Sequence, residues 1–222
     1  MKRGRLAVAL LALSLSGACT TAAPEGDAPM TDLLSAARAG DVAAAQEAIA
    51  AGAELEKRDE RGRTPLLLAV TEDHVEVARL LVAAGADPDA LDDQHDTPWL
   101  VTGVTGSVAM LEVLLPANPD MTIVNRYGGI SVIPASERGH VEYVRRVVQT
   151  GVNVNHVNNL GWTALLECVI LGDGSAKYQE IARILIEAGA DVSIADKDGV
   201  TALQHAERRG FTELAEVLVA QS

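Results

Sequence analysis

Short apolar stretches recur along residues 31–222 at intervals that predict helices rather than strands. Residues 66–70 read Leu-Leu-Leu-Ala-Val, and residues 75–81 place further apolar side chains three and four positions apart. That spacing puts the apolar side chains on one face of a helix. A polar turn separates the two stretches, and Gly85 follows the second, where a left-handed glycine typically ends a helix. The pattern predicts two short helices joined by a turn.

This helix pair repeats through the chain. The residue that ends each pair recurs at steps of 33, 33, 33, 38 and 33 residues: Gly52, Gly85, Asn118, Gly151, Gly189 and Ser222. The residue that opens each pair recurs at the same steps: Thr31, Thr64, Thr97, Ile130, Thr163 and Thr201. A third set lies in the turns between the helices, and its long step falls one unit later: Gly40, Asp73, Gly106, Gly139, Gly172 and Gly210. Together the sets predict about six units, the fifth with five additional residues after Gly172.

The opening threonines are suited to start helices, because a threonine side chain accepts a hydrogen bond from a free N–H of the first turn. The fourth unit departs from this pattern, with Ile130 as its opening residue and Pro134 within its first helix region. In the third unit, Gly103 lowers the helix propensity of the first helix. We therefore expect residues 97–135 to be the least regular part of the domain.

Residues 62–90, GRTPLLLAVTEDHVEVARLLVAAGADPDA, and residues 199–221, GVTALQHAERRGFTELAEVLVAQ, resemble ankyrin repeats. The 33-residue period and the Thr-Pro-Leu opening are signatures of that family. The resemblance covers residues 31–222 and implies an all-α repeat solenoid, in which helix-turn-helix units are connected by β-hairpin loops. It also implies a non-enzymatic scaffold that binds a protein partner through its concave face, formed by hairpin tips and first helices.

Residues 1–18 have the pattern of a signal peptide, in which basic residues precede an apolar stretch of ten residues. A membrane-spanning helix needs about 20 such residues. The small residues before Cys19 resemble the lipidation motif of bacterial lipoproteins, although Ser16 stands where a large apolar residue is usual. Residues 19–30 are predicted to be a flexible tether. We expect export to the periplasm with a lipid anchor at Cys19; soluble secretion is the alternative.

The acidity of the chain restricts its partners. The formal net charge is −13, and loss of the three basic residues of the signal peptide would make it −16. Duplex nucleic acid is a poor partner for such a surface, because its binding depends on neutralising phosphates. Anionic membrane surfaces would also repel it, which leaves lipid at Cys19 as the membrane link. Cys168, the second cysteine, is interpreted as a small buried apolar residue.

No combination of residues in the sequence indicates an enzyme, a cofactor or a metal site. The loop Gly172-Asp173-Gly174-Ser175 lacks the lysine of a phosphate-binding loop and the alternating carboxylates of a calcium loop. The five histidines do not have metal-ligand spacing. We interpret the 172–175 loop as a tolerated insertion. Binding of a small ligand or metal ion there is the alternative.

Aromatic, aliphatic and arginine side chains of the fourth and fifth units form the predicted partner-binding surface, since such residues dominate protein interfaces. Its residues are Arg126, Tyr127, Arg138, Asn159, Leu160, Trp162, Ile170 and Leu171. Trp162 has a second interpretation, packing against the neighbouring hairpin, and Trp99 is expected in the core. We expect a monomer that binds a protein of the bacterial envelope. A structural spacer without a specific partner is the third hypothesis.

Overall fold

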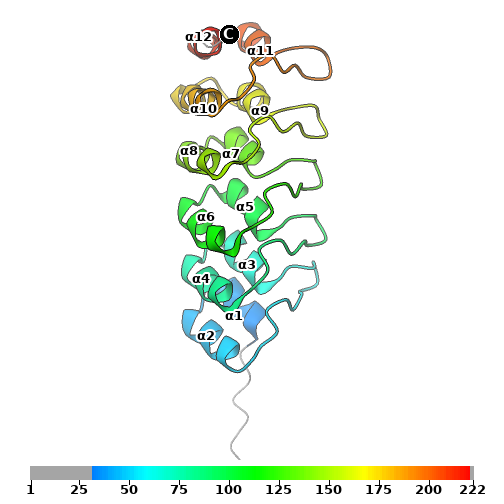
Figure 1. The fold of residues 1–222 in the computed structure, drawn as a ribbon, viewed down its shortest axis with the longest axis vertical. Helices are drawn as coiled ribbons and strands as arrows, with labels where there is room; N and C mark the ends of the chain where they lie inside the picture. The colour runs from blue at the N-terminus through cyan, green and yellow to red at the C-terminus, as the bar shows by residue number, and fades with distance from the viewer. Residues whose placement is uncertain (1–31, 221–222) are drawn as a thin grey trace, which may run out of the picture. The chain divides into compact units, whose positions relative to one another are not determined.

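The computed structural model describes residues 32–220, and within this range twelve α-helices follow one another as six pairs (Figure 1). The pairs are α1 Leu33–Ala39 and α2 Val42–Ala50, α3 Pro65–Thr71 and α4 Val75–Ala84, α5 Pro98–Thr105 and α6 Val108–Leu114, α7 Val132–Arg138 and α8 Val141–Val147, α9 Ala164–Ile170 and α10 Ala176–Glu187, α11 Ala202–Arg209 and α12 Thr212–Val219. Short 3-10 helices, η1 Leu115–Ala117 and η2 Val148–Thr150, extend α6 and α8. The predicted signal peptide, the tether, Cys19, Thr31 and Ser222 lie outside the described residues.

The first helices of the six units form one column and the second helices another, with the long loops projecting beyond the first helices (Figure 1). Each helix packs against its equivalents in neighbouring units, as α3 does against α1 and α5. The predicted all-α repeat solenoid is therefore confirmed. The loops between units reverse direction as hairpins do, but residues 32–220 contain no strand and only one isolated β-bridge, between Ala195 and Thr201.

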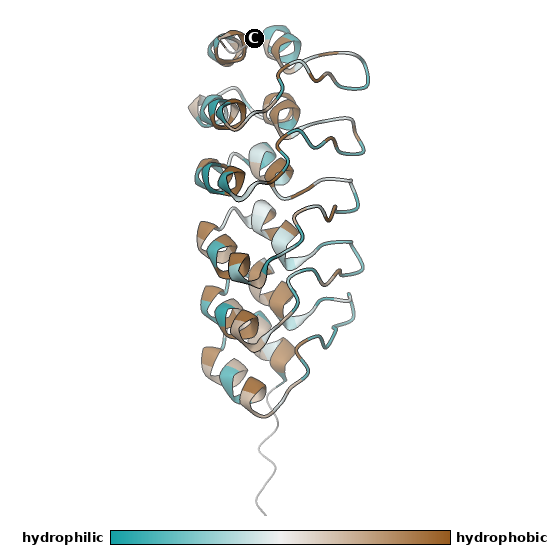
Figure 2. Cartoon of the chain, in the orientation of Figure 1, coloured by the Kyte–Doolittle hydropathy of each residue, from teal (hydrophilic) through white to brown (hydrophobic). Residues whose placement is uncertain are grey.

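The core runs continuously between the two columns and through all six units. It consists of aliphatic side chains with almost no exposed area, such as Leu66, Leu81, Leu111 and Leu166. Figure 2 shows hydrophobic residues concentrated in the helices. Trp99 is 1% exposed, which confirms its predicted place in the core. Because each unit buries its apolar faces against its neighbours, stability is shared along the stack.

Threonine caps start the first helices of four units as predicted, whereas the first helix of the fourth unit has no side-chain cap. The Thr64 hydroxyl accepts a hydrogen bond of 3.2 Å from the Leu67 N–H, and Thr97, Thr163 and Thr201 make the equivalent bonds. With Ile130 in that place, α7 begins one residue later in its unit, at Val132. Pro134 is then the third residue of α7, where its missing N–H leaves no hydrogen bond unmade.

Helix α5 corrects the expectation of a weak first helix in the third unit, although α6 of that unit does pass into the 3-10 helix η1. Helix α5 is regular, and Gly103 is buried in it. A Cβ atom added there would lie 2.0 Å from the carbonyl oxygen of Ser131. Low helix propensity predicts a weak helix at this glycine, but the glycine lets α5 and the chain entering α7 approach closely.

One polar residue holds each loop, a feature that the sequence analysis did not identify. An Asp or Asn side-chain oxygen in each loop accepts the backbone N–H groups two and four residues later. These Asx clamps are Asp59, Asp92, Asn125, Asn158 and Asp196. Neighbouring loop tips are also joined, since the Asn159 N–H donates to the Tyr127 carbonyl at 2.9 Å. The loops therefore form an ordered edge of the stack.

Removing one Asx clamp should destabilise the domain. Asp92→Ala leaves two loop N–H groups without their acceptor and should lower the free energy of unfolding by about 1–2 kcal/mol. Asp92→Asn should cost less, because Asn125 and Asn158 make the same pair of bonds in their own loops. Urea unfolding of the wild type and both variants provides the comparison. Equal losses in the two variants would show that the clamp does not contribute.

Candidate functional site

A groove of about 470 Å³ lies along the loops and first helices of the third, fourth and fifth units. Loop tips form one wall, with Tyr127 and Leu160 at equivalent positions of adjacent loops. The C-terminal ends of α7 and α9 form the other, with Arg138 and Leu171 at equivalent positions. The floor between these walls comes from the exposed sides of α7 and α9. The groove therefore depends on two neighbouring units being stacked correctly.

The structure brings five of the eight predicted binding residues to this groove: Arg126, Tyr127, Arg138, Leu160 and Leu171. It places the other three elsewhere. Trp162 and Ile170 are half-buried and pack against the core. Asn159 lies in the loop edge, where its side chain borders Gly128. The packing interpretation of Trp162 is therefore the one that the structure supports.

The walls expose an unusual amount of apolar surface. The exposed fractions of Tyr127, Leu160 and Leu171 are 56%, 50% and 48%. Large apolar side chains gathered in this way around one hollow favour contact with another molecule over contact with water. The site therefore offers hydrophobic anchoring.

Arg126 is held in place on the loop wall. Its guanidinium group lies 4.7 Å from the centre of the Tyr127 ring and donates a 2.8 Å hydrogen bond to Gln94. It also lies 3.9 Å from the carboxylate of Asp96. Burial raises the pKa of the Asp96 carboxyl, and the nearby negative charge of Asp92 acts in the same direction. These contacts orient Tyr127 and Arg126 before any partner is bound.

Glu167 is a groove residue that the sequence analysis missed. It lies on α9, lines the groove, and is only 6% exposed. Its Oε1 accepts a 2.7 Å hydrogen bond from the side-chain amide of Asn158. Burial, together with the charge of Glu137 on α7, raises the pKa of Glu167 to about 7, although the Asn158 bond opposes the shift. A carboxyl group that titrates near neutral pH therefore forms part of the floor.

The repeat gave only a weak signal for Glu167. Four residues after the opening residue, the six units have Ser35, Leu68, Val101, Pro134, Glu167 and His205. Polar residues therefore occur at this position in three units, and comparing the units does not single out the carboxylate.

The 172–175 loop has a packing role in the structure. The loop of residues 171–175 has two more residues than the corresponding loop 72–74, and the other three added residues extend the start of α10. On this extension, the Tyr178 hydroxyl donates a 2.9 Å hydrogen bond to the carbonyl of Glu137. Asp173 accepts the Ser175 N–H at 2.9 Å, which closes the loop on itself. The insertion thus joins the fifth unit to the fourth.

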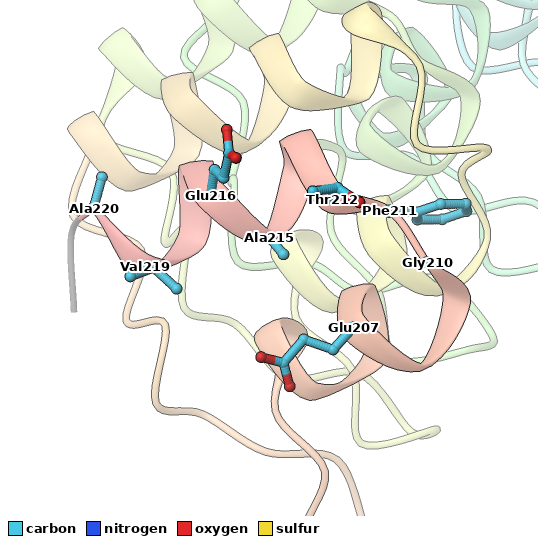
Figure 3. A pocket seen from close by; sticks show the side chains of 8 residues that line it. All are labelled: Glu207, Gly210, Phe211, Thr212, Ala215, Glu216, Val219 and Ala220. Carbon is cyan, nitrogen blue, oxygen red and sulfur yellow. The ribbon is translucent and has the colours of Figure 1, made fainter.

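A second hollow, of about 490 Å³, lies at the C-terminal end of the stack (Figure 3). Phe211, which caps the start of α12, and Ala215 and Val219 of α12 line it, spaced four residues apart. The equivalent residues of α4 include Ala78, which is buried where α4 packs against α6. At Ala215 this hollow therefore exposes a position that is buried against the following unit elsewhere in the stack, whereas Phe211 borders Gly174 of the preceding unit.

Cys168, His74 and His140 lie in surroundings that give them structural roles. Cys168 is fully buried, as predicted, and burial raises the pKa of its thiol. His74 and His140 contact carbonyl oxygens of the preceding unit, at 3.1 and 3.2 Å. Residues 32–220 hold no group of three or more His, Cys, Asp or Glu side chains placed to bind a metal ion. Among the same residues, no helix is long and apolar enough to cross a membrane.

Comparison with known families identifies the repeat. A family model described as "Ankyrin repeats (3 copies)" matches residues 7–92, 33–125 and 99–196. The chain belongs to the ankyrin repeat family. This confirms the resemblance seen in the sequence and agrees with the six helix pairs of the structure.

The ankyrin domain is also similar to individual relatives. The ankyrin repeat protein YahD of Escherichia coli (strain K12) is 45% identical over 103 residues, which is 46% of this chain and 51% of YahD. The match thus spans about half the length of that curated relative. The crystal structure of an ankyrin repeat domain from Acinetobacter baumannii AYE is 45% identical with a TM-score of 0.82, covering 85% of this chain and 96% of that domain.

A more distant solved structure has the same fold. The ankyrin repeat domain of Bcl-3, a member of the IkappaB protein family, is 28% identical with a TM-score of 0.78. The similarity covers 86% of both chains. Ankyrin repeats are generally protein–protein interaction modules and typically non-enzymatic, so the family agrees with the type of site that the groove presents.

Proposed function

We propose that this ankyrin domain is a non-enzymatic scaffold that holds a segment of a protein partner in the groove of its third to fifth units. The observation that carries the proposal is the convergence of Tyr127, Leu160 and Leu171, each about half exposed, on one groove. The aromatic ring and the adjacent Arg126 are residue types that dominate binding energy at protein interfaces. The ordered loop edge supports the proposal, because preorganised groups lose less entropy on binding.

The proposed place of action is the bacterial envelope. The basic and apolar pattern of residues 1–18 supports export, and Cys19 supports a lipid anchor after a tether of residues 19–30. In this proposal residues 31–222 form the exported domain, a monomer whose link to the membrane is the lipid. Its partner is then another protein of the envelope or periplasm.

A capture experiment with groove variants tests the proposal. The full chain would be expressed in its own bacterium, cross-linked in intact envelopes and purified with whatever it has bound. We expect Tyr127→Ala/Leu160→Ala to reduce capture of the partner at least about tenfold, because two interface anchors are removed. Quantitative mass spectrometry of the captured proteins provides the measurement.

The control variant removes similar side chains outside the groove. Val124 and Val157 are exposed apolar residues of the same two loops, and neither lines the groove. Val124→Ala/Val157→Ala should therefore capture the partner as the wild type does. If both double variants capture the same proteins in the same amounts, the groove is not the binding surface. Urea unfolding establishes that each variant is folded.

A further inference from the structure

The groove floor contains two carboxylates without a cationic partner. Glu167 lies on α9, and Glu137 lies on α7 close enough for its charge to raise the pKa of Glu167. Neither side chain forms an ion pair within residues 32–220. Two like charges brought together in a partly buried place repel each other, and an added cation would relieve that repulsion.

The two arginines that line the groove lie on its walls rather than at its floor. Arg126 contacts Asp96, Gln94 and Tyr127 on the loop wall. Arg138 is exposed at the end of α7 and forms no ion pair with any described residue. The groove is lined by three carboxylates and two guanidinium groups, so it retains an excess of negative charge at its floor.

Glu167 is held ready for a further hydrogen bond. Oε1 accepts the amide N–H of Asn158, and Oε2 has no donor among residues 32–220. Asn158 also clamps its loop through its own oxygen, which accepts the N–H groups of Leu160 and Trp162 at 3.0 Å. Both the oxygen and the nitrogen of the Asn158 amide therefore have hydrogen-bond partners. The amide nitrogen donates to the carboxylate of Glu167, which is 6% exposed yet lines the groove.

We infer that the part of the groove that lies over α7 and α9 is a slot for a cationic side chain, lysine or arginine, of the bound partner segment. The alkyl part of such a side chain packs against Leu160, Leu171 and Tyr127, while its charged end meets Glu137 and Glu167. Long cationic side chains commonly combine apolar contact along the stem with a charged tip. This inference rests on the groove being the partner-binding surface, and it specifies which chemistry the partner must present.

Small probes test the slot without the partner. The full chain, labelled with ¹⁵N, would be titrated at about pH 8 with n-butylguanidinium, n-butylammonium or the neutral analogue n-butylurea. We expect one or both cations to shift the amide signals of α7 and α9 saturably, and n-butylurea to shift them much less. The tighter of the two cations distinguishes arginine from lysine. Glu167→Gln keeps an oxygen for Asn158 and should weaken cation binding about tenfold, as expected for loss of a charged hydrogen-bond partner.

Signals of another acidic region serve as the internal control. Asp87, Asp89 and Asp120 lie close to one another on loops away from the groove. Shifts there as large as those of α7 and α9 would show general attraction to an acidic protein and would overturn the slot. Equal binding of n-butylurea, or unchanged cation binding by Glu167→Gln, would overturn it as well.

Different experimental results would contradict the cation slot and the proposed function. If the partner is lost from Tyr127→Ala/Leu160→Ala but is captured fully by Glu137→Gln/Glu167→Gln, the groove binds a partner and the slot is wrong. If the cation probes bind as expected but the Tyr127 and Leu160 variant captures every protein that the wild type does, the slot binds cations and the groove is not the partner-binding surface. Loss of capture in both variants supports both.

Discussion

Replacing Glu167 by Gln should make the domain more stable at pH 8 by about 3 kcal/mol, and at pH 5 by less than about 1 kcal/mol. The pKa of Glu167 is about 7 in the folded protein, above its ordinary value of 4.5. The folded state therefore holds this proton more tightly than the unfolded chain does. Stability is lost as the pH rises from about 4.5 to 7, and the full loss is present above pH 7. Gln has no charge to bury, so the variant avoids this loss.

Urea unfolding of both proteins at pH 5 and pH 8 measures the effect. Glu60→Gln, at an exposed loop position, is the matched control and should change little at either pH. A Glu167→Gln variant that is equally or less stable at pH 8 would contradict the assignment of Glu167 as a strained buried carboxyl. The same substitution is expected to strengthen folding and weaken cation binding, a combination typical of residues kept for function.

Gly103→Ala should lower the free energy of unfolding by about 2 kcal/mol or more, through overpacking in the core. Helix propensity alone predicts the opposite sign, a gain of about 1 kcal/mol. The packing effect should win, because the added Cβ would lie 2.0 Å from the backbone oxygen of Ser131, and no side-chain rotation can relieve that contact. The first, second and fifth units have Ala37, Val70 and Val169 at the same position, all buried, so the close contact that requires glycine is particular to α5 and Ser131.

Gly85→Ala is a useful comparison for Gly103→Ala. Gly85 has no heavy atom within 4 Å of an added Cβ, but its φ is +94°. Gly85→Ala should therefore lower the free energy of unfolding by about 1–2 kcal/mol, through the strain of a left-handed backbone without a steric clash. In thermal or urea unfolding, Gly103→Ala should be less stable than both the wild type and Gly85→Ala. A stabilised Gly103→Ala protein would mean that α5 and the Ser131 backbone can separate easily.

The fold could be predicted from the sequence because its signals repeat. Threonine caps, apolar helix faces and left-handed closing residues recur at fixed steps, and even Asn118 takes the left-handed conformation expected of its column, with φ 55°. The errors arose where one position has two physical roles. Gly103 was judged by propensity, although its small size serves the contact with the next unit.

The site was predicted less completely than the fold. Exposed residues such as Tyr127 and Leu160 could be placed, because loop-tip positions repeat and their side chains cannot reach the core. Glu167 was missed because its role depends on a neighbour nine positions earlier, Asn158, and on Glu137 in another unit. The sequence left two interpretations of Trp162 open, partner contact and packing, and in the structure it is half-buried and packs against the core. Contacts between residues of different units decide such details, and the sequence of a single repeat does not contain them.

The Asx clamps have a consequence for how this family member could diversify. Asp and Asn make the same two backbone bonds, so the clamp fixes the loop but not its charge. Where Asn158 faces Glu167 the clamp donates a hydrogen bond, and where Asp196 faces His205 it accepts one at 2.7 Å. Each loop can therefore exchange acid for amide without altering the backbone. Mutation can therefore retune the charge of the loop edge one unit at a time, at a smaller cost in stability than loss of the clamp, and most easily where the clamp carboxylate forms no ion pair such as that of Asp59 with Arg63.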